Sequence, residues 1–313
     1  MSVTDRTLTV LAGAARRLPY VSPRGIDRIE RTMRVVLAND MARVGAIILL
    51  LFVILAVAAP IIAPNDPTER ITDEDGWVKG AGPSLSAPLG TTDSAYPLFS
   101  RLVYGTRIAF LVGLSTAIIV AGVGTLIGIV AGYRGGRIET LFMRAVDIAY
   151  GLPFLPFVIV LILVLGRGHL SIVAAISALL WRDTARVIRS EVVSIKQQPM
   201  IDAAVASGAS DTRIILHHIL PKVLPITMLY SVFAVGWAII AEAGLSFIGF
   251  GDPEAISWGR VLNNAHTANA IQQELWLWIA APGLLIIGFV LATYFLGQGI
   301  EEVVNPKLRS RGQ

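Results

Sequence analysis

Residues 44–63 read VGAIILLLFVILAVAAPIIA and contain no charged side chain. A helix needs about 20 predominantly apolar residues to cross the hydrocarbon core of a bilayer. This run therefore predicts a membrane-spanning helix, ended by the break Pro64-Asn65-Asp66-Pro67. The alternative is a secretory signal peptide cleaved after Ala56-Val57-Ala58, but a polar leader of 43 residues precedes the run and argues against cleavage.

The composition indicates that most of the chain lies in lipid. Of the 313 residues, 54% are hydrophobic and only 15% are charged, whereas a soluble domain carries about a quarter charged residues. The absence of cysteine excludes disulfides and thiolate metal sites. The net charge of +4 comes from short basic clusters between apolar runs, a pattern that reports membrane topology and gives no sign of a nucleic-acid partner.

Five further apolar runs predict an all-α, polytopic membrane protein with about six spanning helices. They cover residues 108–132, 148–165, 170–181, 224–248 and 276–296. Pro153 and Pro156 predict a kink in the third span, and the short fourth span is expected to continue into polar sequence. The expected organisation is a cytoplasmic tail at 1–43, the first span at 44–63, an external loop at 64–107, a permease-like core at 108–299 with a loop at 182–222, and a cytoplasmic tail at 300–313.

Lys and Arg residues predict the orientation. Of the 26 in the chain, 20 fall on one side of this arrangement, which places both termini in the cytoplasm. In the N-terminal tail, apolar residues recur at helical spacing from Ile26 to Leu37 and predict an amphipathic helix. That helix can lie on the membrane surface or pack on a partner subunit.

The sequence argues against an enzyme and against an ion-coupled carrier. The four histidines, His169, His217, His218 and His266, lie at helix ends or in loops, so neither a catalytic residue nor a metal site is expected. No phosphate-binding loop is present, so ATP and Mg²⁺ are expected on another polypeptide and no cofactor on this chain.

One carboxylate, Glu242, lies within a span, near the predicted outer end. With Ser246 and Phe247 it is a candidate for a gate or pathway group, because charges at membrane depth are usually kept for function. Ordinary packing in the bundle is the favoured interpretation of this segment.

The loop at 182–222 has the pattern of folded structure. Residues 187–195 predict a continuation of the fourth span, and Pro199 breaks it. A short helix from Asp202 should end at Gly208, and Ser210 or Asp211 should cap a second helix that ends at Pro221. Two short helices at an angle would form a compact knob suited to a cleft in another protein.

This loop resembles the EAA loop of ABC importer permeases, which has the pattern EAA, three residues, Gly, nine residues, I-x-L-P. Asp202-Ala203-Ala204, Gly208 and Leu220-Pro221 match that spacing, although Asp202 replaces Glu and His218 occupies the isoleucine position. The resemblance implies a fold like that of type I ABC importers and a set of ATPase-coupling residues: Asp202, Ala203, Ala204, Gly208, Ala209, Asp211, Arg213, Ile219, Leu220 and Pro221.

Other segments are similar to the C-type permeases of dipeptide and oligopeptide transporters. They are Leu89-Gly90-Thr91, Tyr104-Gly105-Thr106-Arg107, the segment at 242–249 and Ser257-Trp258-Gly259. The chain departs from that branch at 93–97, which lacks the usual Gly-Arg-Asp, and at its C-terminal end, where Gln298, Glu301, Glu302 and Asn305 replace an acidic and Arg-Asp pattern.

The resemblance implies several partners in the cell membrane. These are a second homologous permease, two cytoplasmic P-loop ATPases and an external solute-binding protein. Peptide is the expected cargo, with oligosaccharide, opine, nickel or another small solute as the alternative. A membrane scaffold that moves no solute is a second alternative.

Overall fold

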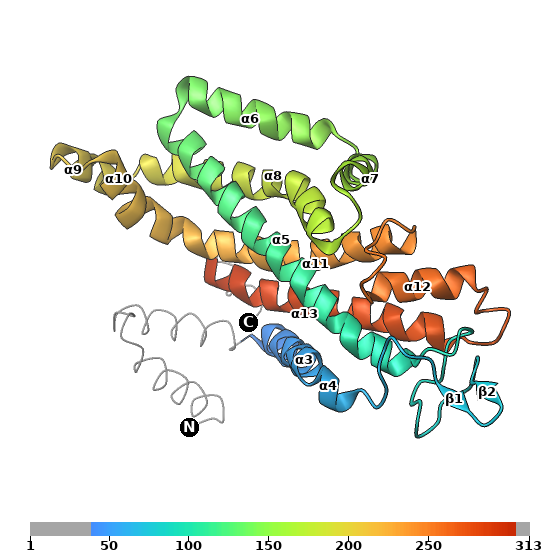
Figure 1. The fold of residues 1–313 in the computed structure, drawn as a ribbon. Helices are drawn as coiled ribbons and strands as arrows, with labels where there is room; N and C mark the ends of the chain where they lie inside the picture. The colour runs from blue at the N-terminus through green and yellow to red at the C-terminus, as the bar shows by residue number, and fades with distance from the viewer. Residues whose placement is uncertain (1–38, 305–313) are drawn as a thin grey trace, which may run out of the picture.

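The computed structural model describes residues 39–304, which are mostly helical, with one pair of two-residue strands (Figure 1). The expected all-α class is confirmed. The amphipathic helix expected at 26–37 lies outside the described residues, as does most of the C-terminal tail. The elements are α3 (Asp40–Val57), α4 (Ala59–Ile62), β1 (Thr72–Asp73), β2 (Gly76–Trp77), α5 (Leu98–Arg134), α6 (Gly136–Gly151), α7 (Phe154–Leu165), α8 (His169–Lys196), α9 (Pro199–Ala206), α10 (Asp211–Ile214), a π-helix (Ile215–Ile219), α11 (Leu220–Phe247), α12 (Trp258–Thr267) and α13 (Leu277–Val304).

Four helices in the described part are long and apolar enough to cross a membrane: α3, α5, the continuous helix Asp211–Phe247, and α13. A fifth span results if α6 and α7 are counted as one bent pair. Helix α8 is long, but its second half carries Arg182, Asp183, Arg186, Arg189 and Glu191. The expected count of six is therefore approximate.

Two of the expected spans differ from their helices. Helix α5 begins at Leu98, just after Pro97, although the apolar run begins only at 108. Its first ten residues were expected in the external loop.

The third span is divided, because Leu152 is extended and Pro153 has no N–H to continue the helical hydrogen bonds. Helices α6 and α7 meet at 98°, which is a break and not a kink. The predicted extension of the fourth span is confirmed, since α8 continues to Lys196.

Helix α5 crosses the molecule from end to end and packs along α8 (Figure 1). Its small residues face α8: a Cβ added at Gly128 would lie 2.7 Å from Ile188 Cβ and 2.8 Å from the Ala185 carbonyl oxygen. Gly124 and Gly132 meet α8 at similar distances, one turn away on each side. Because small residues let two membrane helices approach closely, this row fixes the position of α8 on α5.

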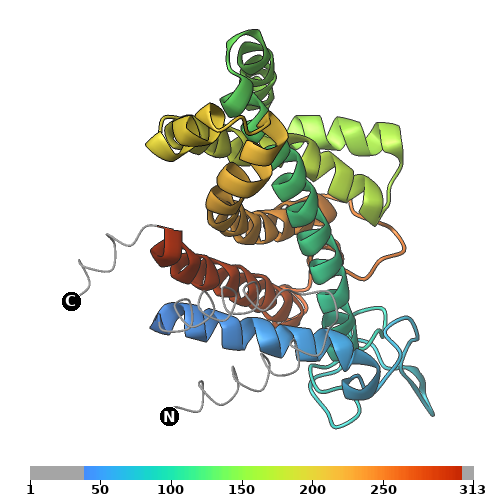
Figure 2. The same cartoon turned by 90° about the vertical axis from the view of Figure 1, so that its left-hand side faces the viewer.

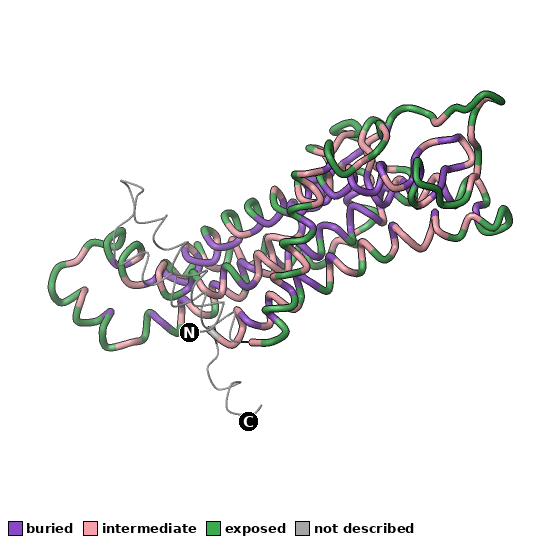
Figure 3. The backbone as a smooth tube through the Cα atoms, turned by 90° about the horizontal axis from the view of Figure 1, so that it is seen from below, coloured by how far each residue is buried: buried purple, intermediate pink, exposed green. Residues whose placement is uncertain are grey.

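Helices α3 and α13 lie side by side, and α5 passes beside α3 (Figure 2). Purple buried backbone runs through the middle of the bundle, whereas the end that carries α9 and α10 is mostly exposed (Figure 3). Large apolar side chains on the outside, such as Leu50, Ile118 and Val164, are exposed by 57%, 72% and 76%. In a bilayer, lipid chains or a neighbouring subunit cover such side chains.

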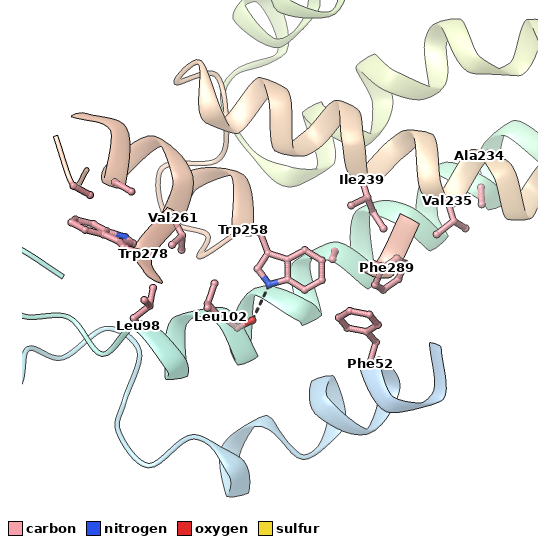
Figure 4. Packing of buried hydrophobic residues seen from close by; sticks show 14 of the residues in the cluster. Phe52, Leu98, Leu102, Ala234, Val235, Ile239, Trp258, Val261, Trp278 and Phe289 are labelled. Atoms are coloured by element: carbon pink, nitrogen blue, oxygen red, sulfur yellow. Dashed lines mark hydrogen bonds between the residues drawn. The ribbon is translucent and has the colours of Figure 1, made fainter. Parts of the chain in front are cut away.

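An aromatic cluster joins four elements at the other end of the bundle (Figure 4). Trp258 on α12 packs against Phe52 on α3, with ring centroids 5.8 Å apart, and Phe52 packs against Phe289 on α13 at 5.0 Å. The Trp258 indole N–H donates to the Leu102 carbonyl of α5 over 2.9 Å. Helix α12 is thereby fixed between α5 and α13.

The packing of α5 on α8 can be tested with a pair of glycine substitutions. Gly128→Ala places a methyl group against α8 backbone and should cost about 1–3 kcal/mol of stability, as overpacking usually does. Gly122→Ala is the matched control, because nothing lies within 4 Å of its added Cβ. Thermal unfolding in detergent should show a lower midpoint for the first variant only. Equal midpoints would contradict this packing.

Candidate coupling surface

Helix α9 begins where the sequence pattern predicted a break. Gln198 is extended and Pro199 occupies the first turn, where a missing N–H costs nothing. Asp202 lies in the first turn and is exposed, which suits the positive end of the helix. The predicted short helix over this segment is thus confirmed, with its start three residues earlier than Asp202.

Gly208 ends α9 as predicted. Its φ of +77° is the left-handed conformation that glycine adopts at little cost. The Gly208 N–H donates to the Val205 carbonyl (2.9 Å), and the Ala209 N–H donates to the Ala204 carbonyl (3.1 Å). These are the two bonds of a Schellman ending. Ser210 then caps α10, its hydroxyl accepting from the Arg213 N–H at 3.4 Å.

The expectation that Pro221 ends the second helix is wrong. Helix α10 continues through the π-helix into α11, and Pro221 lies in the first turn of α11. In the π-helix the Leu220 N–H donates to the Ile215 carbonyl, five residues back. This wider spacing changes the register of the backbone hydrogen bonds next to Pro221. A proline has no N–H and would otherwise interrupt the hydrogen bonds of the helix. The knob is therefore one short helix, α9, attached to the start of a long one.

Buried isoleucines attach α9 and α10 to the bundle. Ile201, Ile214 and Ile219 are exposed by 3%, 1% and 0% and share a cluster with Ile188 of α8 and Tyr133 of α5. The Tyr133 hydroxyl also donates to the Asp211 carboxylate over 2.9 Å. Sequence reasoning missed Tyr133. An aromatic residue at the end of an apolar run was its only signal.

A groove with a volume of about 440 Å³ lies on α9, here called the α9 groove. It is lined by Met200, Ala203, Ala204, Ser207, Gly208, Ala209, Arg213 and His218. Five of the residues predicted for coupling are among them, whereas Asp211 lies beside α5 and Ile219 is wholly buried. Leu220 and Pro221 are partly buried at the start of α11.

Apolar side chains are exposed around the α9 groove. Met200, Val205 and Leu216 are exposed by 41%, 57% and 51%. Apolar side chains gathered beside a groove at a molecular end favour contact with another protein. The groove offers shape and apolar surface, and among the described residues no cluster of three His, Asp or Glu could hold a metal ion.

The second candidate group, around Glu242, lies at the opposite end of α11. Glu242 is exposed by 6% and accepts a hydrogen bond of 2.5 Å from Ser246. Phe247 is partly exposed, and its carbonyl accepts from the Asn263 amide at 2.6 Å. These contacts join α11 to α12 and fit the packing interpretation of the segment.

Comparison with known proteins identifies the family. Residues 124–310, more than half of the chain and all of α6 to α13, match the family described as binding-protein-dependent transport system inner membrane component. The chain belongs to this family. Residues 29–88 match a second family, the N-terminal TM domain of oligopeptide transport permease C.

Relatives of this inner membrane component share most of its length. It is 33% identical over 272 residues to the dipeptide transport system permease protein DppC of Bacillus subtilis, covering 87% of this chain and 83% of the relative. It is also 33% identical over 275 residues to the oligopeptide transport system permease protein OppC of Haemophilus influenzae, covering 87% and 86%. These matches include the α9 groove and both ends of α11.

The conformation of Gly208 gives a test of how the α9 groove is built. No atom lies within 4 Å of a Cβ added there, so any effect of substitution comes from the backbone. Gly208→Val should strain the left-handed residue by about 1–2 kcal/mol and loosen α9, whereas Gly208→Asn, which tolerates this conformation, should not. Hydrogen exchange at 199–214 should rise at least severalfold in the valine variant. Equal protection in both variants would contradict the role of the +77° turn.

Proposed function

We propose that this chain is a permease subunit of an ATP-driven importer and that its cargo is peptide. Membership of the inner membrane component family supports the importer class. The names of DppC and OppC support peptide as the cargo. The observation that carries the mechanism is the α9 groove, an exposed apolar site built on helices that run the length of the bundle.

In this mechanism the α9 groove receives a cytoplasmic ATPase subunit, which binds ATP and Mg²⁺. When two ATPases close on ATP, they move α9, and the buried isoleucines transmit the motion to α8 and α11. The solute pathway then changes between outward and inward access. Such coupling requires that the ATPase bind the groove with different free energies in the two states.

The remaining parts of the complex follow from this role. The α9 groove faces the cytoplasm of the cell membrane, both termini lie on that side, and β1, β2 and α12 lie outside. This agrees with the excess of Lys and Arg expected on the cytoplasmic side. A second homologous permease completes the pathway, a second ATPase binds that permease, and an external solute-binding protein delivers the peptide.

The coupling role can be tested with two alanines of α9. Ala203 and Ala206 are both exposed, but only Ala203 lines the groove. Ala203→Arg should fill the groove and weaken ATPase binding at least tenfold, which corresponds to about 1.4 kcal/mol. Ala206→Arg should leave binding near the wild-type value. The measurement is quantitative mass spectrometry of proteins that co-purify with the tagged chain in mild detergent.

The second permease provides the internal control, because its interface is expected elsewhere and its recovery should be equal in both variants. If P-loop ATPases co-purify with the wild type and Ala203→Arg retains them fully, the groove is not the coupling surface. If no ATPase accompanies the wild type, the importer assignment fails and a scaffold becomes the better explanation.

A further inference from the structure

A polar cavity of about 360 Å³ opens at the end of the bundle opposite the α9 groove. It lies between the loop before α5, the first turn of α5, helix α12 and the first turn of α13. Its lining residues are Thr92, Asp93, Ser94, Tyr96, Arg101, Arg260, Asn264, Thr267, Ala268 and Trp278. No role described above involves this cavity.

Arg101 is a buried cation without a counter-ion. Its exposed fraction is 9%, and its Nε has no hydrogen-bond acceptor within the described part of the chain. The guanidinium lies over the Tyr96 ring, 4.6 Å from its centroid, so the ring covers a face and leaves the N–H groups at the edge free. Burying an unpaired cation is costly, which indicates that an anion is supplied from outside the chain.

Trp278 lines the same cavity and carries a second donor that has no acceptor among the described residues. The indole is exposed by 3%, and its Nε1 has no acceptor among the residues described. In Figure 4 Trp278 lies beside Val261 and Leu98, within the same apolar cluster as Trp258. Buried indole N–H groups usually have a partner, so this donor also lacks its acceptor.

Arg260 adds positive charge and is firmly placed. Its Nη1 donates to the carbonyls of Asp252, Pro253 and Ala255 at the loop before α12. Asp93 also lines the cavity, yet within residues 39–302 no carboxylate forms an ion pair with Arg101 or Arg260. Two arginines and one aspartate leave the cavity with one net positive charge.

We propose that this cavity is a carboxylate-binding site. A carboxylate has two acceptor oxygens with about four lone pairs between them, so it can accept from the planar Arg101 donors and from the Trp278 indole together, and its single charge balances the cavity. The volume suits a small ligand or one side chain and not a whole protein segment. The identification of the source rests on the proposed function. In an importer the carboxylate has two sources: the terminal carboxylate of a delivered peptide and an acidic side chain of the binding protein.

The site itself is tested with a ligand pair that differs only in charge. N-acetyl-alanine carries the carboxylate, and N-acetyl-alanine amide is its neutral counterpart. At 20 mM or so, the first should raise the thermal midpoint of the purified complex in nanodiscs by a few degrees and the second should not, because a ligand bound to the folded state stabilises it. Arg101→Gln and Trp278→Phe should each abolish the shift.

Lys79→Gln is the matched control, since it removes an exposed cation from the same end of the molecule, and the ring it contacts, Trp77, does not line the cavity. If Arg101→Gln fails to assemble, Trp278→Phe still decides, because it removes the N–H and keeps the ring. The proposal is overturned if the wild type shows no shift, if the amide gives an equal shift, or if the shift survives in Trp278→Phe.

A second measurement separates the two sources. If the carboxylate belongs to the binding protein, Trp278→Phe should lower its docking affinity at least fivefold, both empty and loaded with tri-alanine. If it belongs to the peptide, docking should be unchanged and transport at saturating binding protein should fall. If neither the docking affinity nor the transport rate falls, the proposal that the cavity acts in transport is overturned. If no binding protein stimulates transport by the wild-type complex, the proposed function is contradicted. The thermal test of the cavity remains valid in that case.

Discussion

The close approach of α5 and α8 is the contact on which the rest of the molecule depends. Helix α5 has 37 residues and a length of about 55 Å, so it reaches both ends of the bundle. Near one end Tyr133 packs against residues of α9 and α10, and near the other Arg101 lines the polar cavity. The glycine row at 124, 128 and 132 sets the position of α8 against this helix, and α8 leads directly into α9.

Local chemistry allowed much of the α9 region to be predicted. A proline at the start, an acidic residue in the first turn and a glycine at the end define α9 within its own segment, and each acts through neighbouring backbone groups. The family resemblance lies in the same segment. What these residues contact could not be read in this way. The contact between Tyr133 and Asp211 joins positions 78 residues apart, and no spacing rule connects them.

The errors have a common physical origin. Pro221 was expected to end a helix and Pro153 only to bend one, yet the first lies within a continuous helix and the second separates two. A proline removes one N–H in every case, and the surrounding backbone decides the result. At Pro221 the π-helix changes the register, whereas at Leu152 the chain is extended and α7 turns away. The early start of α5 is similar, because residues 98–107 mix polar and apolar side chains, and Leu98 and Leu102 of this segment pack with Trp258 of α12.

The relative strength of contacts shows how α9 can act as a rigid part. The ion pair between Arg134 and Asp211 spans 3.8 Å with both side chains more than half exposed, and such pairs contribute about 0–1 kcal/mol. Each fully buried isoleucine contributes about 1.5–3 kcal/mol, and Ile201, Ile214 and Ile219 are all buried. The connection between α9 and the long helices is therefore mainly apolar. Salt would weaken the ion pair and leave this connection intact. In the proposed mechanism, packed side chains would therefore carry a force applied at the α9 groove into α8 and α11.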